Sequence, residues 1–161
     1  MTDSELDRYM RMYYKSVYSV ALCGCKNPDD AYDIAQDVFL KLYTSDIRFT
    51  GDEHVKAWLL RCAMNRSTDH VRSYWFRNSR PLEDASDKVY RPGQDTEGHD
   101  LLKLVMKLGR NERAVMYLHY YEYYTVKELS VMLGASEQAL RSRLRRGKAR
   151  LKKLLENERN E

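Results

Sequence analysis

Long apolar runs are absent from this chain of 161 residues. A helix that crosses a membrane needs roughly 18–20 consecutive apolar residues, and no segment approaches that length. The first ten residues, MTDSELDRYM, are polar and acidic, so they do not form a secretory signal peptide. We therefore expect a cytoplasmic protein that makes no stable insertion into a membrane.

Glycine and proline are scarce, at seven and three residues, whereas residues that favour helices are abundant. No segment shows the alternation of apolar and polar residues that marks a half-buried strand. Hydrophobic residues form 43% of the chain, which is enough to build packed cores. The composition therefore predicts an all-α fold.

The chain has three cysteines and four histidines, and neither set shows a chemical motif. Cys23 and Cys25 form a C-x-C pair and Cys62 lies on an apolar helix face, but no second pair has the spacing of a metal or redox site. In the cytosol we expect these cysteines to be buried or incidental reduced thiols. The histidines are scattered, and there is no phosphate-binding loop. The sequence therefore predicts no enzyme, no metal site and no cofactor.

Charge is unevenly distributed along the chain, although the formal net charge is only +4. Residues 1–78 carry 11 basic and 11 acidic side chains, and residues 79–98 carry 3 and 5. Residues 99–161 carry 14 basic and 8 acidic side chains, so the positive excess lies wholly in the last third. This distribution is expected if that part alone contacts nucleic acid.

A helix-turn-helix motif is predicted near the C-terminal end of the chain. Thr125 and Glu128 form a capping box at the start of its first helix. Gly134 ends that helix in the left-handed region, and Ser136 caps the second helix. From Arg141 to Lys153 the second helix has eight basic residues and no acidic one, while an apolar row runs along its other side: Leu140, Leu144, Leu151, Leu154 and Leu155. One side of this helix can therefore pack while the rest enters a DNA groove.

Three longer amphipathic helices are predicted in the first half of the chain, over residues 3–23, about 28–44 and 52–76. The second opens at Asn27-Pro28-Asp29-Asp30, an Asx cap followed by proline and two carboxylates. One outward stripe of this helix, at i, i+3, i+4 and i+7, consists of Asp33, Gln36, Asp37 and Leu40. The residues alone leave two interpretations open: a solvated acidic face, or a docking surface, at which an exposed leucine hints.

The helical pattern fails after residue 78, where prolines, glycines and acidic residues are frequent and large apolar residues are few. This segment is predicted to be an interdomain linker over residues 79–98. The chain is therefore predicted to have two small helical domains, over residues 1–78 and 99–161.

Further details are predicted within each domain. In the first, Trp58 is expected in the core, in a row with Val55, Leu59, Cys62 and Ala63. In the second, a short helix over residues 101–108 should end at Gly109, and a helix over 112–121 should be capped by Asn111.

The two helical modules, the polar linker and the C-terminal helix-turn-helix resemble the extracytoplasmic function (ECF, group IV) sigma factors of bacterial RNA polymerase. Residues 30–43, DAYDIAQDVFLKLY, are similar to the family's region 2.2. Residues 55–72, VKAWLLRCAMNRSTDHVR, are similar to regions 2.3–2.4, and residues 104–155 are similar to region 4. The chain also departs from the family, since Tyr32 replaces a usual glutamate and HYYEYYT (119–125) lacks the glycine that normally precedes the helix-turn-helix.

The resemblance implies a protein that directs core RNA polymerase to promoters and initiates transcription. The β′ clamp helices of the core would bind the stripe formed by Asp33, Gln36, Asp37 and Leu40. The melted −10 strand would contact the loop before the third helix and four residues on that helix: Asn65, Arg66, Asp69 and Arg72. The −35 element would contact Arg141, Ser142, Arg145 and Arg146. Besides promoter DNA, the resemblance implies the β flap of the polymerase and an anti-sigma factor as partners.

Two other functions are compatible with parts of the chain. A stand-alone helix-turn-helix regulator would leave the stripe on the second helix unexplained. A sigma-like accessory protein of a mobile element would bind core polymerase without directing transcription. Core binding and run-off transcription distinguish these alternatives.

Overall fold

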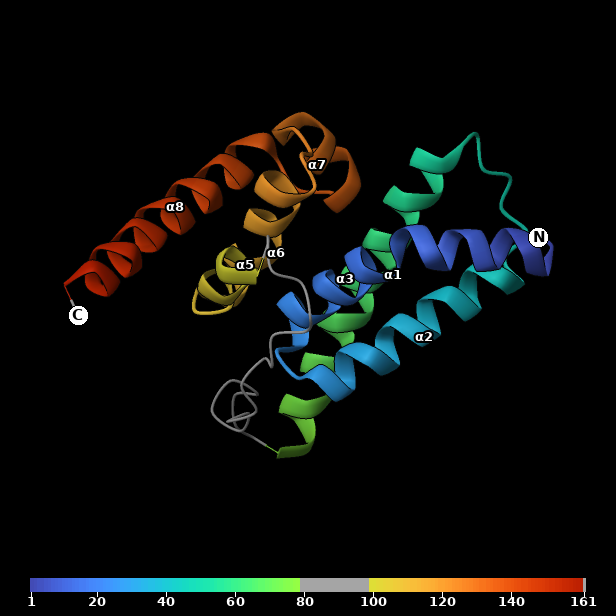
Figure 1. Cartoon of the computed structure of the whole chain (residues 1–161), viewed down its shortest axis with the longest axis horizontal. Helices are drawn as coiled ribbons and strands as arrows, with labels where there is room; N and C mark the ends of the chain where they lie inside the picture. Colours follow the sequence, from blue (N-terminus) through green and yellow to red (C-terminus); the bar gives the residue numbers. More distant parts are fainter. Residues whose placement is uncertain (79–98, 161) are drawn as a thin grey trace. The chain divides into compact units, whose positions relative to one another are not determined.

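A computed structural model of the chain describes residues 1–78 and 99–160, with the side chains of 1–73 and 102–160. All of the secondary structure in these residues is helical, which confirms the all-α prediction (Figure 1). The chain divides into two compact units, Met1–Val89 and Tyr90–Glu161. The linker predicted over residues 79–98 lies outside the described part of the chain.

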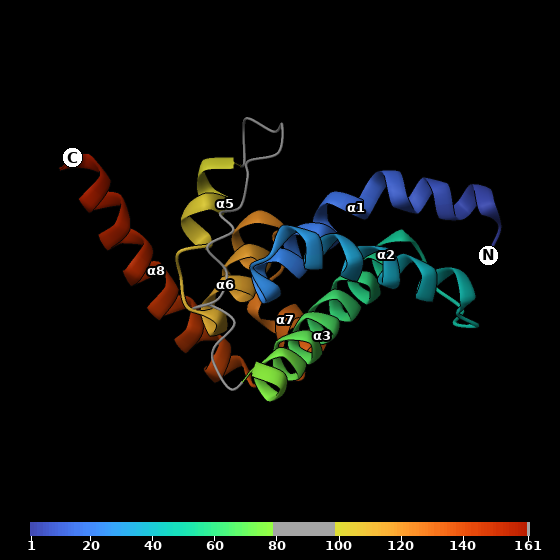
Figure 2. The same ribbon diagram turned by 90° about the horizontal axis from the view of Figure 1, so that it is seen from below.

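The first unit is built from α1 (Asp3–Cys25), α2 (Pro28–Thr44) and α3 (Asp52–Asn78). α1 and α2 run side by side in opposite directions, and α3 packs against both (Figures 1 and 2). The Tyr43 hydroxyl near the end of α2 donates a hydrogen bond to Asp3 at the start of α1, with a distance of 2.7 Å. This contact joins the C-terminal end of α2 to the N-terminal end of α1, as expected for two antiparallel helices.

Side chains at the helix starts explain where the first two helices begin. At α2 the side-chain oxygen of Asn27 accepts hydrogen bonds from the backbone N–H groups of Asp29 and Asp30, as predicted. At α1, Thr2 and Glu5 form a reciprocal capping box that was not predicted.

The core of the first unit lies where the three helices meet. Apolar side chains at helical spacing fill it, among them Val17, Val20, Leu22, Ala31, Ala35, Val38, Leu42, Leu59 and Leu60. α1 and α3 approach so closely at Gly24 that a Cβ atom there would lie 2.3 Å from the Cβ of Ser67. The three cysteines are buried and form no disulfide, as predicted, and burial raises the pKa of Cys62.

The second unit contains four α-helices in its described residues: α5 (His99–Val105), α6 (Arg110–Met116), α7 (Val126–Leu133) and α8 (Glu137–Arg159). α6 continues directly into a π-helical turn, η1 (Tyr117–Tyr121), which was not predicted. α8 packs against α5, α6 and α7, so it organises this unit.

Two boundary predictions in the second unit were wrong. The first helix ends at Val105, and Gly109 is the N-cap of α6, whereas Asn111 already lies inside the first turn of α6. At this boundary the buried guanidinium of Arg113 donates a hydrogen bond to the Leu108 carbonyl, five positions earlier in the chain, at 3.1 Å, and this bond closes the turn before α6.

The helix-turn-helix forms at the predicted residues. Thr125 and Glu128 make the reciprocal capping box of α7. Gly134 ends α7 with φ at 64°, a left-handed conformation that glycine adopts without steric cost. The Ser136 hydroxyl accepts a hydrogen bond from the backbone N–H of Ala139 at 3.1 Å and opens α8. Leu129, Leu140 and Leu144 are buried between the two helices and the rest of the unit.

Each helix among the described residues is too short or too polar to span a lipid bilayer.

Candidate nucleic-acid and partner interfaces

The stripe predicted to dock a partner lies on the outer face of α2. All four of its side chains, Asp33, Gln36, Asp37 and Leu40, are exposed. Leu40 is 61% exposed, which is high for a leucine on a helix whose opposite side is buried. Tyr32 and Tyr43 of the same helix are also exposed, at 53% and 40%. The outer face of α2 therefore combines apolar groups with carboxylates.

The stripe predicted to contact the −10 strand lies on α3, and all of its side chains are exposed: Asn65, Arg66, Asp69 and Arg72. Arg66 reaches back to α2, where its Nη1 atom lies 3.7 Å from Oδ2 of Asp37. The two predicted surfaces are therefore neighbours that share one ion pair. Next to them, His70 of α3 lies 2.9 Å from Asp30 of α2, which ties the same two helices together.

The loop over residues 45–51 connects α2 to α3 and is supported by aromatic side chains. The Phe49 ring packs edge-on against Trp58 and His54, with centroid distances of 5.6 and 5.0 Å. The backbone N–H of Thr50 donates a hydrogen bond to Nδ1 of His54 at 3.1 Å.

The structure corrects the prediction that Trp58 belongs to the core. Trp58 is only partly buried, whereas its neighbours Leu59 and Leu60 are fully buried. Its ring lies under the loop beside Phe49, and Nζ of Lys41 lies 5.9 Å from the ring centroid. Periodicity placed Trp58 in the core row, but in the folded unit its ring packs against Phe49 of the loop.

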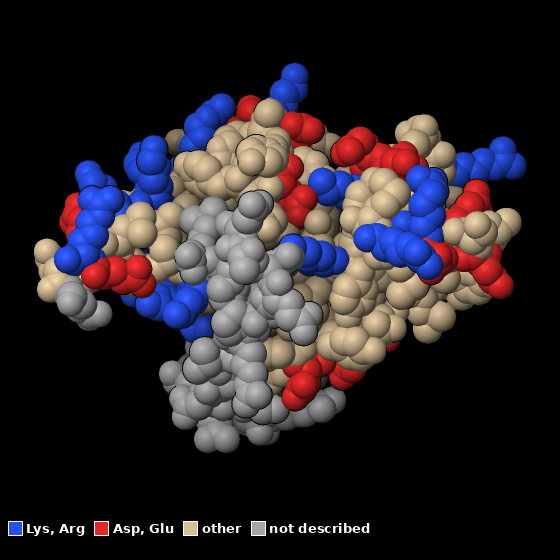
Figure 3. Space-filling view, viewed as in Figure 1, with Lys and Arg blue, Asp and Glu red and all other residues tan. Residues whose placement is uncertain are grey.

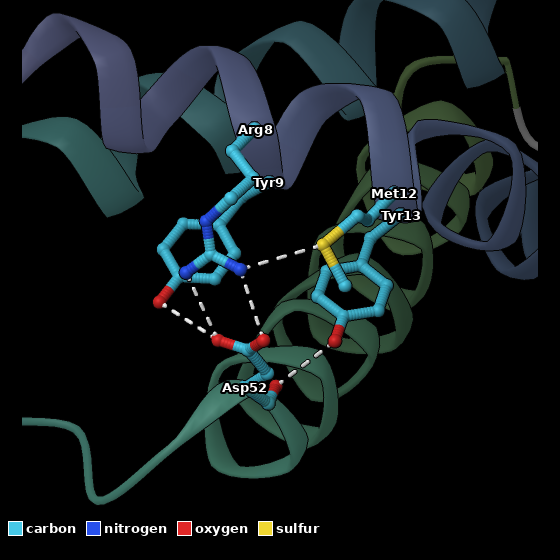
Figure 4. Close-up of polar contacts among 5 residues, drawn as sticks. All are labelled: Arg8, Tyr9, Met12, Tyr13 and Asp52. Carbon is cyan, nitrogen blue, oxygen red and sulfur yellow. Dashed lines mark hydrogen bonds and ion pairs between the residues drawn. The ribbon is translucent and has the colours of Figure 1, made fainter.

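A polar cluster that was not predicted joins α1 to the start of α3 (Figure 4). The Arg8 guanidinium makes two hydrogen bonds to the Asp52 carboxylate, at 2.9 and 3.1 Å. The Tyr9 hydroxyl donates to the same carboxylate, and the Tyr13 hydroxyl donates to the Asp52 carbonyl, both at 3.3 Å. Because the Arg8 guanidinium hydrogen-bonds to it, the pKa of Asp52 is lowered from its ordinary value. The partners are more than thirty residues apart, so no local pattern could have revealed them.

The recognition helix α8 has one packed side and one basic side. Leu140, Leu144 and Gly147 are buried against the rest of the unit. Lys and Arg side chains recur along the exposed length of α8 (Figure 3). Arg141 and Arg145 are exposed, so both are accessible to a DNA groove.

The other two residues predicted to contact the −35 element have different surroundings. Ser142 is half-buried between its basic neighbours. Arg146 faces α6, where its Nε atom lies 3.4 Å from Oε1 of Glu112. Arg146 therefore differs from Arg145, because a carboxylate of the same unit already balances its charge.

An apolar groove of about 330 Å³ lies in the second unit. α5, α6, η1 and α8 contribute its lining, which consists of Leu102, Val105, Met116, Tyr117, Tyr120, Tyr121, Lys148, Leu151, Lys152 and Leu155. Leu155 belongs to the predicted apolar row of the recognition helix, yet it is 43% exposed at this groove. The groove depends on the π-helical turn, which brings its tyrosines to face α8, and so the sequence did not predict it.

Known proteins share both halves of this architecture. The family model for Sigma-70 region 2 matches residues 8–77, and the model for Sigma-70 region 4 matches residues 99–151. The ECF RNA polymerase sigma factor SigM of Mycobacterium tuberculosis (strain H37Rv) is 28% identical over 149 residues, which cover 92% of this chain and 76% of that protein. The chain belongs to the ECF sigma factors of the sigma-70 family.

Two further similarities agree with this membership. The ECF RNA polymerase sigma factor SigM of Bacillus subtilis (strain 168) is 29% identical over 156 residues, which cover 92% of this chain and 94% of that protein. The fold resembles the sigma factor RpoE of Bartonella quintana, solved in complex with the anti-sigma factor NepR, with a TM-score of 0.72 and 19% identity. That similarity covers 94% of this chain and 97% of RpoE.

As an ECF sigma factor, the protein binds core RNA polymerase and initiates transcription, and it is not an enzyme. The helix-turn-helix therefore acts as region 4 of a sigma factor, which excludes the stand-alone regulator considered above. Within residues 1–78 and 99–160, no group of three potential metal ligands lies together.

Proposed function

We propose that the outer face of α2 docks on the β′ clamp helices of core RNA polymerase. The observation that carries this proposal is the 61% exposed Leu40 among Asp33, Gln36 and Asp37, on a helix inside the segment that matches region 2. An exposed leucine surrounded by carboxylates suits a partner that offers both apolar contact and positive charge. Oδ2 of Asp37 lies 3.7 Å from Nη1 of Arg66, so this face borders the stripe on α3.

The melted −10 strand is proposed to run along α3 and the loop before it. The exposed stripe of α3 offers cations for phosphates and amide groups for base edges. The loop adds exposed Ile47 and Arg48 next to the packed ring of Phe49. The domain that performs these steps is proposed to comprise residues 1–78, followed by a linker over 79–98.

The second domain, residues 99–161, is proposed to read the −35 element through Arg141, Ser142, Arg145 and Arg146. Support comes from the helix-turn-helix geometry, in which the N-terminal turns of the second helix enter the major groove. The apolar groove of this unit is proposed to hold the polymerase β flap or an anti-sigma factor, as its apolar lining suits a helix of a partner. Because these partners act in the cytoplasm, we propose a cytoplasmic location for the protein.

Charge reversal at Asp37 tests the docking proposal. We expect Asp37→Lys to weaken binding to core polymerase by at least about tenfold, because a cation would replace a carboxylate at the centre of the interface. Binding can be measured by fluorescence anisotropy of labelled protein titrated with core enzyme.

Asp7→Lys is a matched control for this experiment. Asp7 also pairs with an arginine, and its side chain is 61% exposed against 55% for Asp37, but it lies on α1. The control should bind core like the wild type, and both variants should unfold at the wild-type urea concentration. Unchanged affinity of Asp37→Lys for core polymerase would refute the docking proposal.

A further inference from the structure

The loop proposed to contact the −10 strand ends at a residue that is held from another helix. Asp52 is the first residue of α3 and directly follows the loop over residues 45–51. Both of its carboxylate oxygens accept hydrogen bonds from Arg8 of α1, at 2.9 and 3.1 Å (Figure 4). α1 therefore fixes the point at which the loop enters α3.

The geometry of this contact is directional. A guanidinium that binds both oxygens of one carboxylate restrains its distance and also its orientation. The Tyr9 and Tyr13 hydroxyls add contacts to the carboxylate and to the carbonyl of the same residue. Asp52 is thus held by three side chains from two successive turns of α1.

Stability alone is a poor explanation for this cluster. The side chains of Arg8 and Asp52 are 49% and 42% exposed, and water screens an ion pair in such a position. The buried contacts between α1 and α3 already hold the helices together. The cluster instead fixes the position of Asp52, where the chain leaves the loop and enters α3.

The other contacts at this end of the loop are made with α3 itself. Thr50 is bound to His54, and Phe49 packs on Trp58, so the last residues of the loop rest on the first turns of α3. Any movement of the start of α3 would carry these residues with it. The exposed side chains of Ile47 and Arg48 would then shift relative to the stripe on α3.

We propose that Arg8 is a positioning residue for −10 recognition, which acts through Asp52 on the loop over residues 45–51. Arg8 does not contact the bases in this proposal, and it sets where the loop presents its side chains to them. The inference rests on the proposed role of the loop and α3 at the −10 strand.

The test is selection from a promoter library by holoenzyme reconstituted from the full chain and core polymerase. The library is randomised separately at the −10 and −35 elements, and each template carries a transcribed barcode that identifies its promoter. Sequencing of the barcodes in run-off transcripts gives the transcript yield and the base preferences for each element. The variants are Arg8→Gln, Asp52→Asn and the exchanged pair Arg8→Asp with Asp52→Arg. The control is Arg11→Gln, which removes an arginine of the same helix whose side chain is 80% exposed, against 49% for Arg8, and whose partner, Asp7, lies on that helix as well.

We expect Arg8→Gln and Asp52→Asn to reduce discrimination at the −10 element by about tenfold, the size of one lost base contact. Preference at the −35 element should stay at the wild-type level, and so should affinity for core polymerase. The exchanged pair should recover part of the −10 discrimination, because it restores an ion pair at the same place. Arg11→Gln should behave as the wild type.

The outcomes separate this inference from the proposed function. If the wild-type holoenzyme shows no preference at the −10 element, the proposed role of the loop is wrong. If the wild type selects and Arg8→Gln selects equally, the positioning role is wrong. An equal loss of transcript yield on all −10 sequences would mark Arg8 as a phosphate contact. A parallel loss of discrimination at the −35 element would mark a general structural defect. Either result would also overturn the inference.

Discussion

Replacing Gly24 by alanine should strongly destabilise the first unit, because α1 and α3 are in contact there. The new Cβ atom would lie 2.3 Å from Cβ and 2.8 Å from Oγ of Ser67. The position of a Cβ atom is set by the backbone, so no rotation of the side chain relieves this overlap. Ser67 cannot move away easily either, since it is buried and its hydroxyl donates to the Ala63 carbonyl at 2.7 Å.

The magnitude follows from the size of the overlap. Relief requires the two helices to separate by roughly 1 Å, and a gap of that size forfeits about a quarter to a half of the dispersion energy of the atoms that lose contact. Overpacking of this kind costs typically ~1–3 kcal/mol. Alanine regains less than about 1 kcal/mol of helix propensity, because Gly24 lies near the end of α1. The expected net loss is roughly 1–2 kcal/mol, or roughly 4–16 °C in the melting temperature of a unit of this size.

Tryptophan fluorescence measures this loss selectively. The chain has two tryptophans, Trp58 and Trp75, and both lie in α3. Their emission during urea or thermal unfolding therefore reports the first unit in the intact protein. Gly51→Ala is the control, since a Cβ atom at Gly51 would meet no other atom within 4 Å.

A second substitution makes the reasoning refutable. Ser67→Gly removes the Cβ atom that alanine would strike, so Gly24→Ala combined with Ser67→Gly should be more stable than the sum of the single effects predicts. The coupling energy should reach about 1 kcal/mol, within the range known for residues in contact. A wild-type midpoint for Gly24→Ala, or strictly additive effects in the double variant, would show that the helices do not approach as described.

Three more outcomes are expected. Tyr123 is 84% exposed and has φ at 62°, a left-handed conformation that costs a bulky residue ~1–2 kcal/mol. Tyr123→Gly should therefore raise the thermal midpoint of the second unit measured by circular dichroism, and an unchanged or lower midpoint would contradict this. Arg145→Ala should reduce discrimination between −35 sequences by about 1–3 kcal/mol in competition binding. Arg146→Ala should have a smaller effect, because Glu112 balances the charge of Arg146. A larger effect of Arg146→Ala would refute the assignment of Arg145 as the base-reading residue. Burial raises the pKa of Tyr13. The folded unit therefore holds the Tyr13 proton more tightly than the unfolded chain does. The resulting stabilisation is fully present below the ordinary tyrosine pKa of about 10 and is lost as the pH rises through the pKa of Tyr13 in the folded unit. Tyr13→Phe should flatten the decline of the urea midpoint between about pH 9 and pH 11, and an equally steep decline in that variant would contradict the prediction.

Local features were predicted from the sequence because the interacting atoms lie within a few residues. The caps at Asn27, Thr125 and Ser136 bind backbone groups two or three positions further along, and Gly134 acts on its own backbone. The outward stripe on α2 follows from helical spacing alone. The all-α fold and the membership in the ECF sigma factors rest on these same local patterns, which the chain repeats in both units.

Contacts between distant residues were decided only by the tertiary structure. The ion pairs of Arg8 with Asp52 and of Arg146 with Glu112 join residues 44 and 34 positions apart, so no periodicity could indicate them. A helical pattern specifies which face of each helix is apolar, but the packing of helices against one another selects which polar side chains meet at the edges. For that reason the sequence predicted the surfaces of this protein, and the packed structure showed which of their charges are already paired.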